Sequence, residues 1–193
     1  MANKKKSGKK KGNKKTGAAP MATGAFFAEE AHSSGHIPKP VVIPAPSPNH
    51  ASRQGQVIQY LILHNTDGPG EVSLAILRDP HDGNPRSSHY MVDRDGTIYQ
   101  LVDDSQTAWH AGNKPINQQS IGIEIVAWKQ AQGMAPVQEA AVVALSRYVL
   151  DAYDVRLANV KPHRAVRIGG TDCPGWIWPT DVKLEAWKTA NLS

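Results

Sequence analysis

The sequence predicts a single mixed α/β domain, in which a central sheet of mixed strand direction is flanked by helices. Two observations favour this class. Short apolar runs rich in β-branched residues are mixed with segments of helical periodicity, and one pair of runs is joined as a hairpin. The length of 193 residues suits about one domain, and hydrophobic residues make up 40% of it, enough for a core.

The first expected strand is Val57–Leu63, a nearly continuous apolar run that is typical of a buried central strand. Residues 65–70 read Asn-Thr-Asp-Gly-Pro-Gly, which predicts a loop directly after it. We expect a short helix over Val72–Leu77. Next, His89–Val92 and Thr97–Val102 enclose an Asp-Gly turn, which predicts a β-hairpin.

The second half of the chain predicts one more central strand and two helices. Ile121–Ala127 is the strand, with a single charged residue among apolar ones. Pro136–Tyr153 is the clearest helix, because its apolar residues recur every three or four positions and proline suits the first helical turn. We expect a last helix from about Asp181 to Ala190.

The charge of the chain is concentrated in one terminal segment. The formal net charge is +5, but residues 1–15 hold eight lysines and no acid, so subtracting them leaves −3 for residues 16–193. Such a segment cannot bury apolar surface, and we expect residues 1–17 to be disordered. The mildly acidic remainder argues against a specific nucleic-acid-binding fold, whereas a tail of this kind could bind polyanions.

Residues 38–48 contain five prolines, which favour extended polyproline conformation. We therefore expect a disordered tail and linker over residues 1–49 and a folded domain over residues 50–193. No apolar run approaches the ~18 residues that cross a bilayer. Residues 18–28 are too diluted by polar and turn-forming residues for a convincing secretory signal, so synthesis in the cytoplasm is expected. One cysteine, Cys173, excludes an internal disulfide framework.

Three residues of the types that bind zinc lie near the expected ends of strands. His64 follows the first strand, His163 lies after the long helix, and Cys173 follows ten residues later. Two imidazoles and a thiolate suit Zn²⁺, and a three-ligand site leaves a position for water. The spacing matches no compact zinc motif, and a single histidine or cysteine is more often a satisfied structural residue.

Five segments of the chain together resemble the zinc-dependent N-acetylmuramoyl-L-alanine amidases of type 2, a family that includes many phage endolysins and is related to peptidoglycan recognition proteins. The segments are residues 61–66, 88–100, 108–112, 120–124 and 171–175. The resemblance covers about residues 55–180. It implies a zinc ion held by His64, His163 and Cys173 at the floor of a groove, and hydrolysis of the amide between N-acetylmuramic acid and L-alanine of peptidoglycan.

The resemblance also implies two catalytic residues. Glu124 lies within an apolar strand, where a carboxylate is costly unless it is paired or solvated. From the residues alone it could be a salt-bridged glutamate, whereas the family motif makes it the base that deprotonates the attacking water. Thr171 stands where many relatives carry a lysine that stabilises the oxyanion, and a hydroxyl is a weaker electrostatic stabiliser. Arg164 or a backbone N–H could take that role instead.

Substrate contacts are expected from His89, Trp109 and His110, which the resemblance places near the groove. An ordinary structural histidine is an equally good interpretation of His110, and Trp109 could belong to the core. Ser88 stands where some relatives carry a catalytic tyrosine, so a tyrosine-assisted mechanism is not expected.

The leading hypothesis is therefore a monomeric zinc amidase, similar to a phage endolysin, that is made in a host cytoplasm and acts on the bacterial cell wall. Its partner is peptidoglycan, and its Lys4–Lys15 tail binds anionic envelope polymers or lipopolysaccharide. One alternative is a non-catalytic peptidoglycan-binding module, which would normally have lost a ligand. Another is a polyanion-binding protein with structural zinc, which the acidic domain and the absence of an aromatic-basic stripe disfavour.

Overall fold

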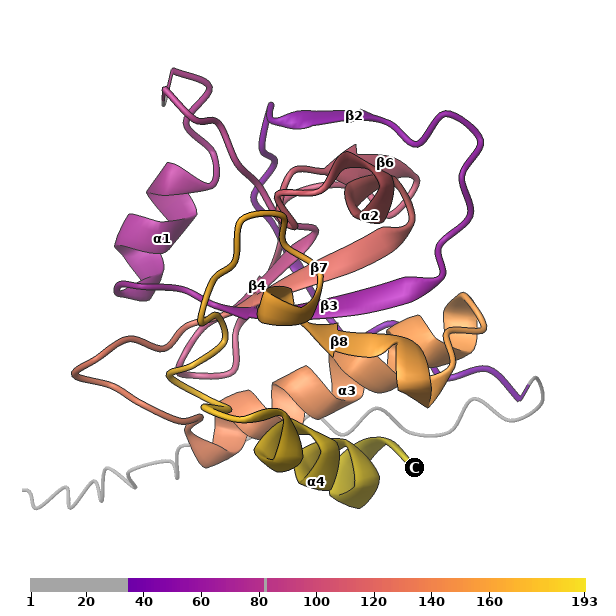
Figure 1. The fold of residues 1–193 in the computed structure, drawn as a ribbon, viewed down its shortest axis with the longest axis vertical. Coiled ribbons are helices and arrows are strands. Elements are labelled where there is room, and N and C mark those ends of the chain that lie inside the picture. The colour runs from indigo at the N-terminus through magenta and orange to yellow at the C-terminus, as the bar shows by residue number, and fades with distance from the viewer. Residues whose placement is uncertain (1–34, 82) are drawn as a thin grey trace, which may run out of the picture. The chain divides into compact units, whose positions relative to one another are not determined.

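A six-stranded mixed sheet forms the centre of the computed structural model, which describes residues 35–81 and 83–193 (Figure 1). Its strands, in the order β1-β5-β4-β7-β3-β8, are β1 (Ile43–Pro44), β5 (Ile98–Gln100), β4 (Tyr90–Val92), β7 (Ser120–Ile125), β3 (Tyr60–Asn65) and β8 (Val160–Pro162). β3 pairs parallel with β7 and β8, and β4 pairs parallel with β7 but antiparallel with β5. This arrangement confirms the predicted mixed sheet and its hairpin.

Helices cover both faces of this sheet. α3 (Pro136–Ala152) and α4 (Asp181–Leu192) pack on one face. On the other side lie α1 (Gly70–Ile76), α2 (Lys114–Gln118) and a small antiparallel pair of β2 (His50–Ser52) with β6 (Gln106–Ala108). Two 3₁₀ turns, Leu157–Asn159 and His163–Ala165, flank β8. Within the described residues, none of these helices has the length and apolarity of a membrane span.

The pleat of β7 separates the core from the opposite face of the sheet. Ile121, Ile123 and Ile125 are fully buried in the main core cluster, which also contains Leu145 of α3 and Trp187 of α4. Because strand side chains alternate, Ser120, Gly122 and Glu124 face the other way. The strand therefore presents three polar or small residues in a row to the side of the sheet that carries α1 and α2.

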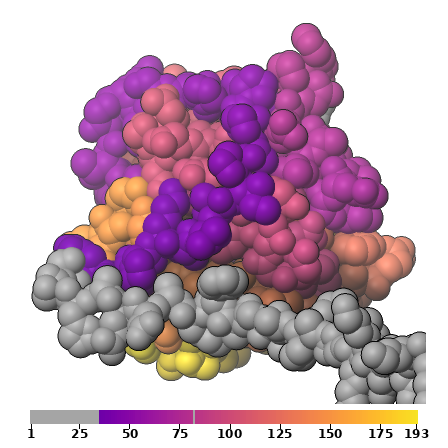
Figure 2. Space-filling model, turned by 180° about the vertical axis from the view of Figure 1, so that it is seen from behind, coloured from indigo at the N-terminus to yellow at the C-terminus, as the bar shows by residue number. Residues whose placement is uncertain are grey.

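The folded domain begins earlier than the sequence predicted. Residues 35–193 form one compact unit, and residues 43–44 pair with β5 as strand β1. The proline-rich segment is a strand and strap because its free backbone groups bond to the domain: the Ala45 N–H donates to the carbonyl of Gln100, and the Ser47 N–H to that of Leu101. Figure 2, which views the molecule from behind, shows the indigo start of the described chain lying across the surface of the domain. The predicted lysine-rich tail lies outside the described residues.

The first predicted strand also shifts along the chain. β3 spans Tyr60–Asn65 and not Val57–Leu63, so His64 lies inside the strand instead of following it. Val57 is 67% exposed, whereas His64 is buried, because the parallel neighbour β7 extends the pairing as far as Asn65. The ligand candidate is consequently held by the sheet.

Candidate active site

A cavity of about 1000 Å³ opens where β3 and β7 end, and it collects most of the predicted site residues. Register places His64 of β3 directly opposite Glu124 of β7, so both side chains project from the same face. His163 follows β8, the other parallel neighbour of β3, and Cys173 comes from the loop beyond it. Parallel strands that end at one edge thus bring together residues up to 109 positions apart.

The three predicted metal ligands converge. One potential ligand atom from each of His64, His163 and Cys173 lies within 4.8 Å of the other two. The Nδ1 atom of His64 lies 3.9 Å from the sulfur of Cys173, and the rings of the two histidines are 4.4 Å apart at their centroids. These separations are close to those of ligands that share one tetrahedral ion.

The unused hydrogen-bonding capacity of these ligands fits a metal ion. The Nε2 atom of His163 is buried and has no partner among the described residues, although its ring also bonds the backbone of Ala111. Burial lowers the pKa of His163 to about 4 and that of His64 well below its usual value, with the neighbouring histidines adding to the effect on His64. Both imidazoles are therefore neutral at pH 7, the form that coordinates a cation.

The surroundings of the Cys173 sulfur disfavour the charged thiolate form. Burial, and then the carboxylate of Glu124, raise the pKa of the thiol. The backbone N–H of Asn65 points at the sulfur from 3.3 Å. A bound cation would offset the cost of the charge, because metal ligation deprotonates a thiol.

Glu124 combines burial with a position beside the ligands. Its Oε1 atom lies 3.8 Å from the Nδ1 atom of His64, and its Oε2 atom is buried without a hydrogen-bond partner in the described part of the chain. Burial raises the pKa of this carboxyl to about 7, although the guanidinium of Arg86 acts in the opposite direction. A carboxyl with a pKa near neutrality that lines a cavity is suited to accept and return a proton.

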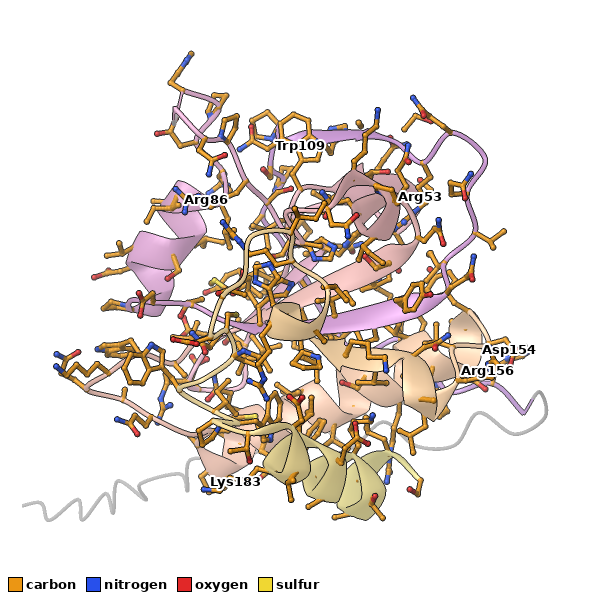
Figure 3. The ribbon with its side chains drawn as sticks, in the orientation of Figure 1. Arg53, Arg86, Trp109, Asp154, Arg156 and Lys183 are labelled. Atoms are coloured by element: carbon orange, nitrogen blue, oxygen red, sulfur yellow. The ribbon has the colours of Figure 1, made fainter. Side chains whose placement is uncertain are left out.

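Three further predicted residues line the same cavity. Thr171 lies beside the ligands, and its Oγ1 atom accepts a hydrogen bond of 3.2 Å from the N–H of Cys173. Trp109 is half-buried in the wall, and Figure 3 shows it near β6. His110 is 8% exposed and bonds His64, so it reaches the ligands as well as the cavity. Arg164 lines the cavity too, but Asp181 and the carbonyl of Trp178 engage its guanidinium.

The prediction that His89 contacts substrate is wrong. Its side chain is fully buried and does not line the cavity. The Nε2 atom lies 2.8 Å from Arg53 and 3.1 Å from the carbonyl of Gln106, and the Nδ1 atom accepts from the N–H of Gly122. The side chain of His89 points into the protein, where Arg53 and the backbone of Gly122 bond it. The sequence of residues 88–100 reveals neither contact. His89 is a structural residue that ties β4 to β7.

Sequence reasoning missed two residues that matter here. Arg86 lines the cavity near α1 and acts electrostatically on Glu124, but a single arginine in a polar loop carries no signal (Figure 3). Ser120 bonds the ring of His110. Its alternation with Gly122 and Glu124 on one strand face was the signal that could have drawn attention to it.

Comparison with known proteins relates the chain to one family. A family described as N-acetylmuramoyl-L-alanine amidase matches residues 54–176, which include all three ligand candidates and Glu124. The chain is 30% identical over 159 residues to N-acetylmuramoyl-L-alanine amidase AmiD of Escherichia coli, covering 69% of this chain and 56% of that protein. It thus spans about half the length of the curated relatives it matches.

Solved structures show the same fold. A mutant endolysin from Bacillus subtilis superposes with a TM-score of 0.60 at 26% identity, covering 77% of this chain and 97% of that one. AmpDh3 from Pseudomonas aeruginosa, solved with an anhydromuramic pentapeptide, gives a TM-score of 0.56 at 25% identity, covering 72% of this chain and 62% of that one.

Proposed function

The chain belongs to the family of N-acetylmuramoyl-L-alanine amidases, and from this premise we propose that it hydrolyses the amide that joins N-acetylmuramic acid to L-alanine in peptidoglycan. The reaction breaks the amide C–N bond with water and leaves a lactyl carboxylate and the free amino group of alanine. The observation that carries the proposal is the convergence of His64, His163 and Cys173 within 4.8 Å beside Glu124, whose Oε2 atom is buried.

Zinc is the metal that this donor set favours, because imidazole nitrogen and thiolate sulfur are its common protein ligands. A zinc ion held there would supply Lewis acidity toward the amide carbonyl and would lower the pKa of a water molecule. A non-catalytic module of this fold would be expected to have lost one of the three ligands, and all three are in place.

Glu124 is the proposed general base and acid. As a carboxylate it accepts a proton from the attacking water, and it then returns that proton to the departing nitrogen of alanine. A pKa of about 7 suits both steps, since the group gains and loses a proton with little cost near neutral pH. Its orphaned Oε2 atom is available to receive the proton because no described residue bonds it.

Thr171 is the proposed donor to the oxygen of the tetrahedral intermediate. Its Oγ1 atom already accepts from the N–H of Cys173, so its own proton is free to be donated toward the cavity. The half-buried indoles of Trp109 and Trp176 line the same cavity, where aromatic faces can pack against a sugar ring.

The experiment is digestion of purified peptidoglycan, with new amino-terminal alanine as the product measured. We expect a chelator to abolish product formation and Glu124→Gln to lower the rate by about 10²–10⁴-fold. Glu71→Gln is the matched control, since Glu71 is exposed on α1 and does not line the cavity. Release of other termini, or full activity of Glu124→Gln, would contradict the proposal.

The biological setting is also proposed. The similarity to an endolysin supports action on a bacterial cell wall by a protein made in a host cytoplasm. The eight lysines among residues 4–15 support binding of anionic envelope polymers or lipopolysaccharide. A monomer is the proposed oligomeric state.

A further inference from the structure

A series of three hydrogen bonds begins at the Nε2 atom of His64, the ring nitrogen opposite the one that lies near Cys173 and Glu124. The Nε2 atom of His64 lies 3.0 Å from the Nδ1 atom of His110. The Nε2 atom of His110 lies 3.1 Å from the hydroxyl oxygen of Ser120, and that hydroxyl lies 2.6 Å from the carbonyl of Ile116 in α2. All three side chains are at least nine-tenths buried.

The last hydrogen bond of the series, from Ser120 to the carbonyl of Ile116, determines which ring nitrogens of His110 and His64 carry protons. A carbonyl oxygen can only accept, so the Ser120 hydroxyl donates its single proton to Ile116. The hydroxyl must then accept from His110, which places the proton of that ring on Nε2 and leaves its Nδ1 bare. A bare Nδ1 can only accept in turn, so the neutral ring of His64 donates from Nε2.

The consequence for His64 is that its Nδ1 atom carries no proton. This is the atom that lies 3.9 Å from the sulfur of Cys173 and 3.8 Å from Glu124. An imidazole in the other tautomer would direct an N–H at the metal position and could not coordinate an ion there.

We propose that His110 and Ser120 are positioning residues, which hold His64 in the tautomer that binds a metal ion and thereby set the affinity of the site. This inference rests on the proposed metal centre, and the role it gives to His110 and Ser120 is exerted through His64. Groups bonded to the far nitrogen of a metal-bound histidine commonly change metal affinity by about 10–100-fold.

The strand β7 is built to accommodate this series of hydrogen bonds. Ser120 and Gly122 lie on the face that also carries Glu124, and the ring of His110 lies directly over Gly122. A Cβ atom at position 122 would lie 2.6 Å from the Cγ atom of His110, so a glycine is required for the ring to lie there. Three alternate residues of β7 therefore have separate roles. Ser120 ends the series of hydrogen bonds, Gly122 leaves space for the ring of His110, and Glu124 is the proposed base.

The first test is made on metal-free protein without substrate, so its result does not depend on whether an amide is hydrolysed. Long-range ¹⁵N–¹H correlation spectra distinguish the two imidazole tautomers, and the His64 signals are assigned by their loss in His64→Gln. We expect both His64 and His110 to carry their protons on Nε2. A proton on Nδ1 of either ring would overturn the proposal.

The second test measures zinc affinity by competition with a chromogenic chelator. His110→Leu fills the space without an acceptor, whereas His110→Asn keeps an oxygen near the position of Nδ1. We expect His110→Leu to weaken zinc binding by about 10–100-fold and His110→Asn to retain more affinity. A role in packing alone would rank these two variants in the opposite order, and equal affinity of both with the unmodified protein would also overturn the proposal.

Ser120→Ala provides a smaller perturbation, should His110→Leu fail to fold. It removes the hydroxyl that accepts the hydrogen bond of His110. We therefore expect a mixture of His110 tautomers and about 10-fold weaker zinc binding. Ser146→Ala is the matched control, because Ser146 is also fully buried but its hydroxyl has no partner among the described residues. Unchanged affinity in Ser120→Ala would refute the role of Ser120. A protein that binds no zinc would refute the metal centre itself.

Discussion

Replacing Gly122 with alanine tests whether the close contact between β7 and His110 is as tight as the structure shows. The added Cβ atom would lie 2.6 Å from Cγ, 2.7 Å from Nδ1 and 2.8 Å from Cδ2 of the His110 ring. All three separations are shorter than real Cβ contacts. The ring cannot move freely, since His64 and Ser120 bond it from both sides.

The expected cost follows from two opposing effects. Overpacking a well-packed interior costs about 1–3 kcal/mol, and here it also displaces His110 from its partners. Replacing glycine by alanine within a strand regains about 0.5–1 kcal/mol of conformational entropy, because Gly122 has ordinary strand geometry. We therefore expect Gly122→Ala to lower the free energy of unfolding by roughly 0.5–2 kcal/mol.

Urea unfolding of four proteins gives a decisive measurement: the unmodified chain, Gly122→Ala, His110→Ala and the double variant. In the His110→Ala background the clash is gone, so we expect Gly122→Ala to be neutral or stabilising there. Gly83→Ala serves as a control, because a Cβ atom at that exposed position meets nothing within 4 Å. An equal cost of Gly122→Ala in both backgrounds would refute the reasoning.

Three other predictions follow from the site and the chain. Burial, followed by the charge of Arg53, lowers the pKa of His89 to about 3, so between pH 6.5 and 3 the unfolded chain binds a proton that the folded protein excludes. This one group should lower the free energy of unfolding by up to about 1.4 kcal/mol per pH unit as the pH falls through that range, and His89→Gln should reduce the slope by one proton; equal slopes would contradict it. Cys173→Ser should bind zinc more weakly and lose most amidase activity, measured by chelator competition and by release of amino-terminal alanine, and activity that survives both this change and removal of metal would refute the zinc mechanism. Deleting residues 1–17 should weaken binding to anionic envelopes and should make the remaining binding less dependent on salt, while cleavage of soluble muropeptide keeps its rate. An equal loss of activity on the soluble substrate would show that the segment supports the site.

Local patterns predicted most elements of the fold well. The periodicity of residues 136–153 predicted α3 to within one residue, and the Asp-Gly turn placed the β4–β5 hairpin. The β2–β6 pair and the short strand β8 were missed, because each has only three residues and, unlike β4 and β5, no tight-turn sequence joins it to its partner strand. The start of the domain was also missed, since proline content predicted extended backbone but could not show that a sheet edge was available to pair with it.

The sequence by itself determined most of the candidate site residues, through residue types suited to zinc, a carboxylate in an apolar strand, and motifs in an order that resembles one family. Only the tertiary structure decided which of them meet. Parallel pairing of β3 with β7 and β8 set His64 beside Glu124 and His163, and the same packing turned His89 inward and directed His110 to His64. The physical reason is that hydrogen bonds and ligand contacts depend on distances of a few ångströms between side chains, which strand register and packing decide and which separation along the chain does not reveal.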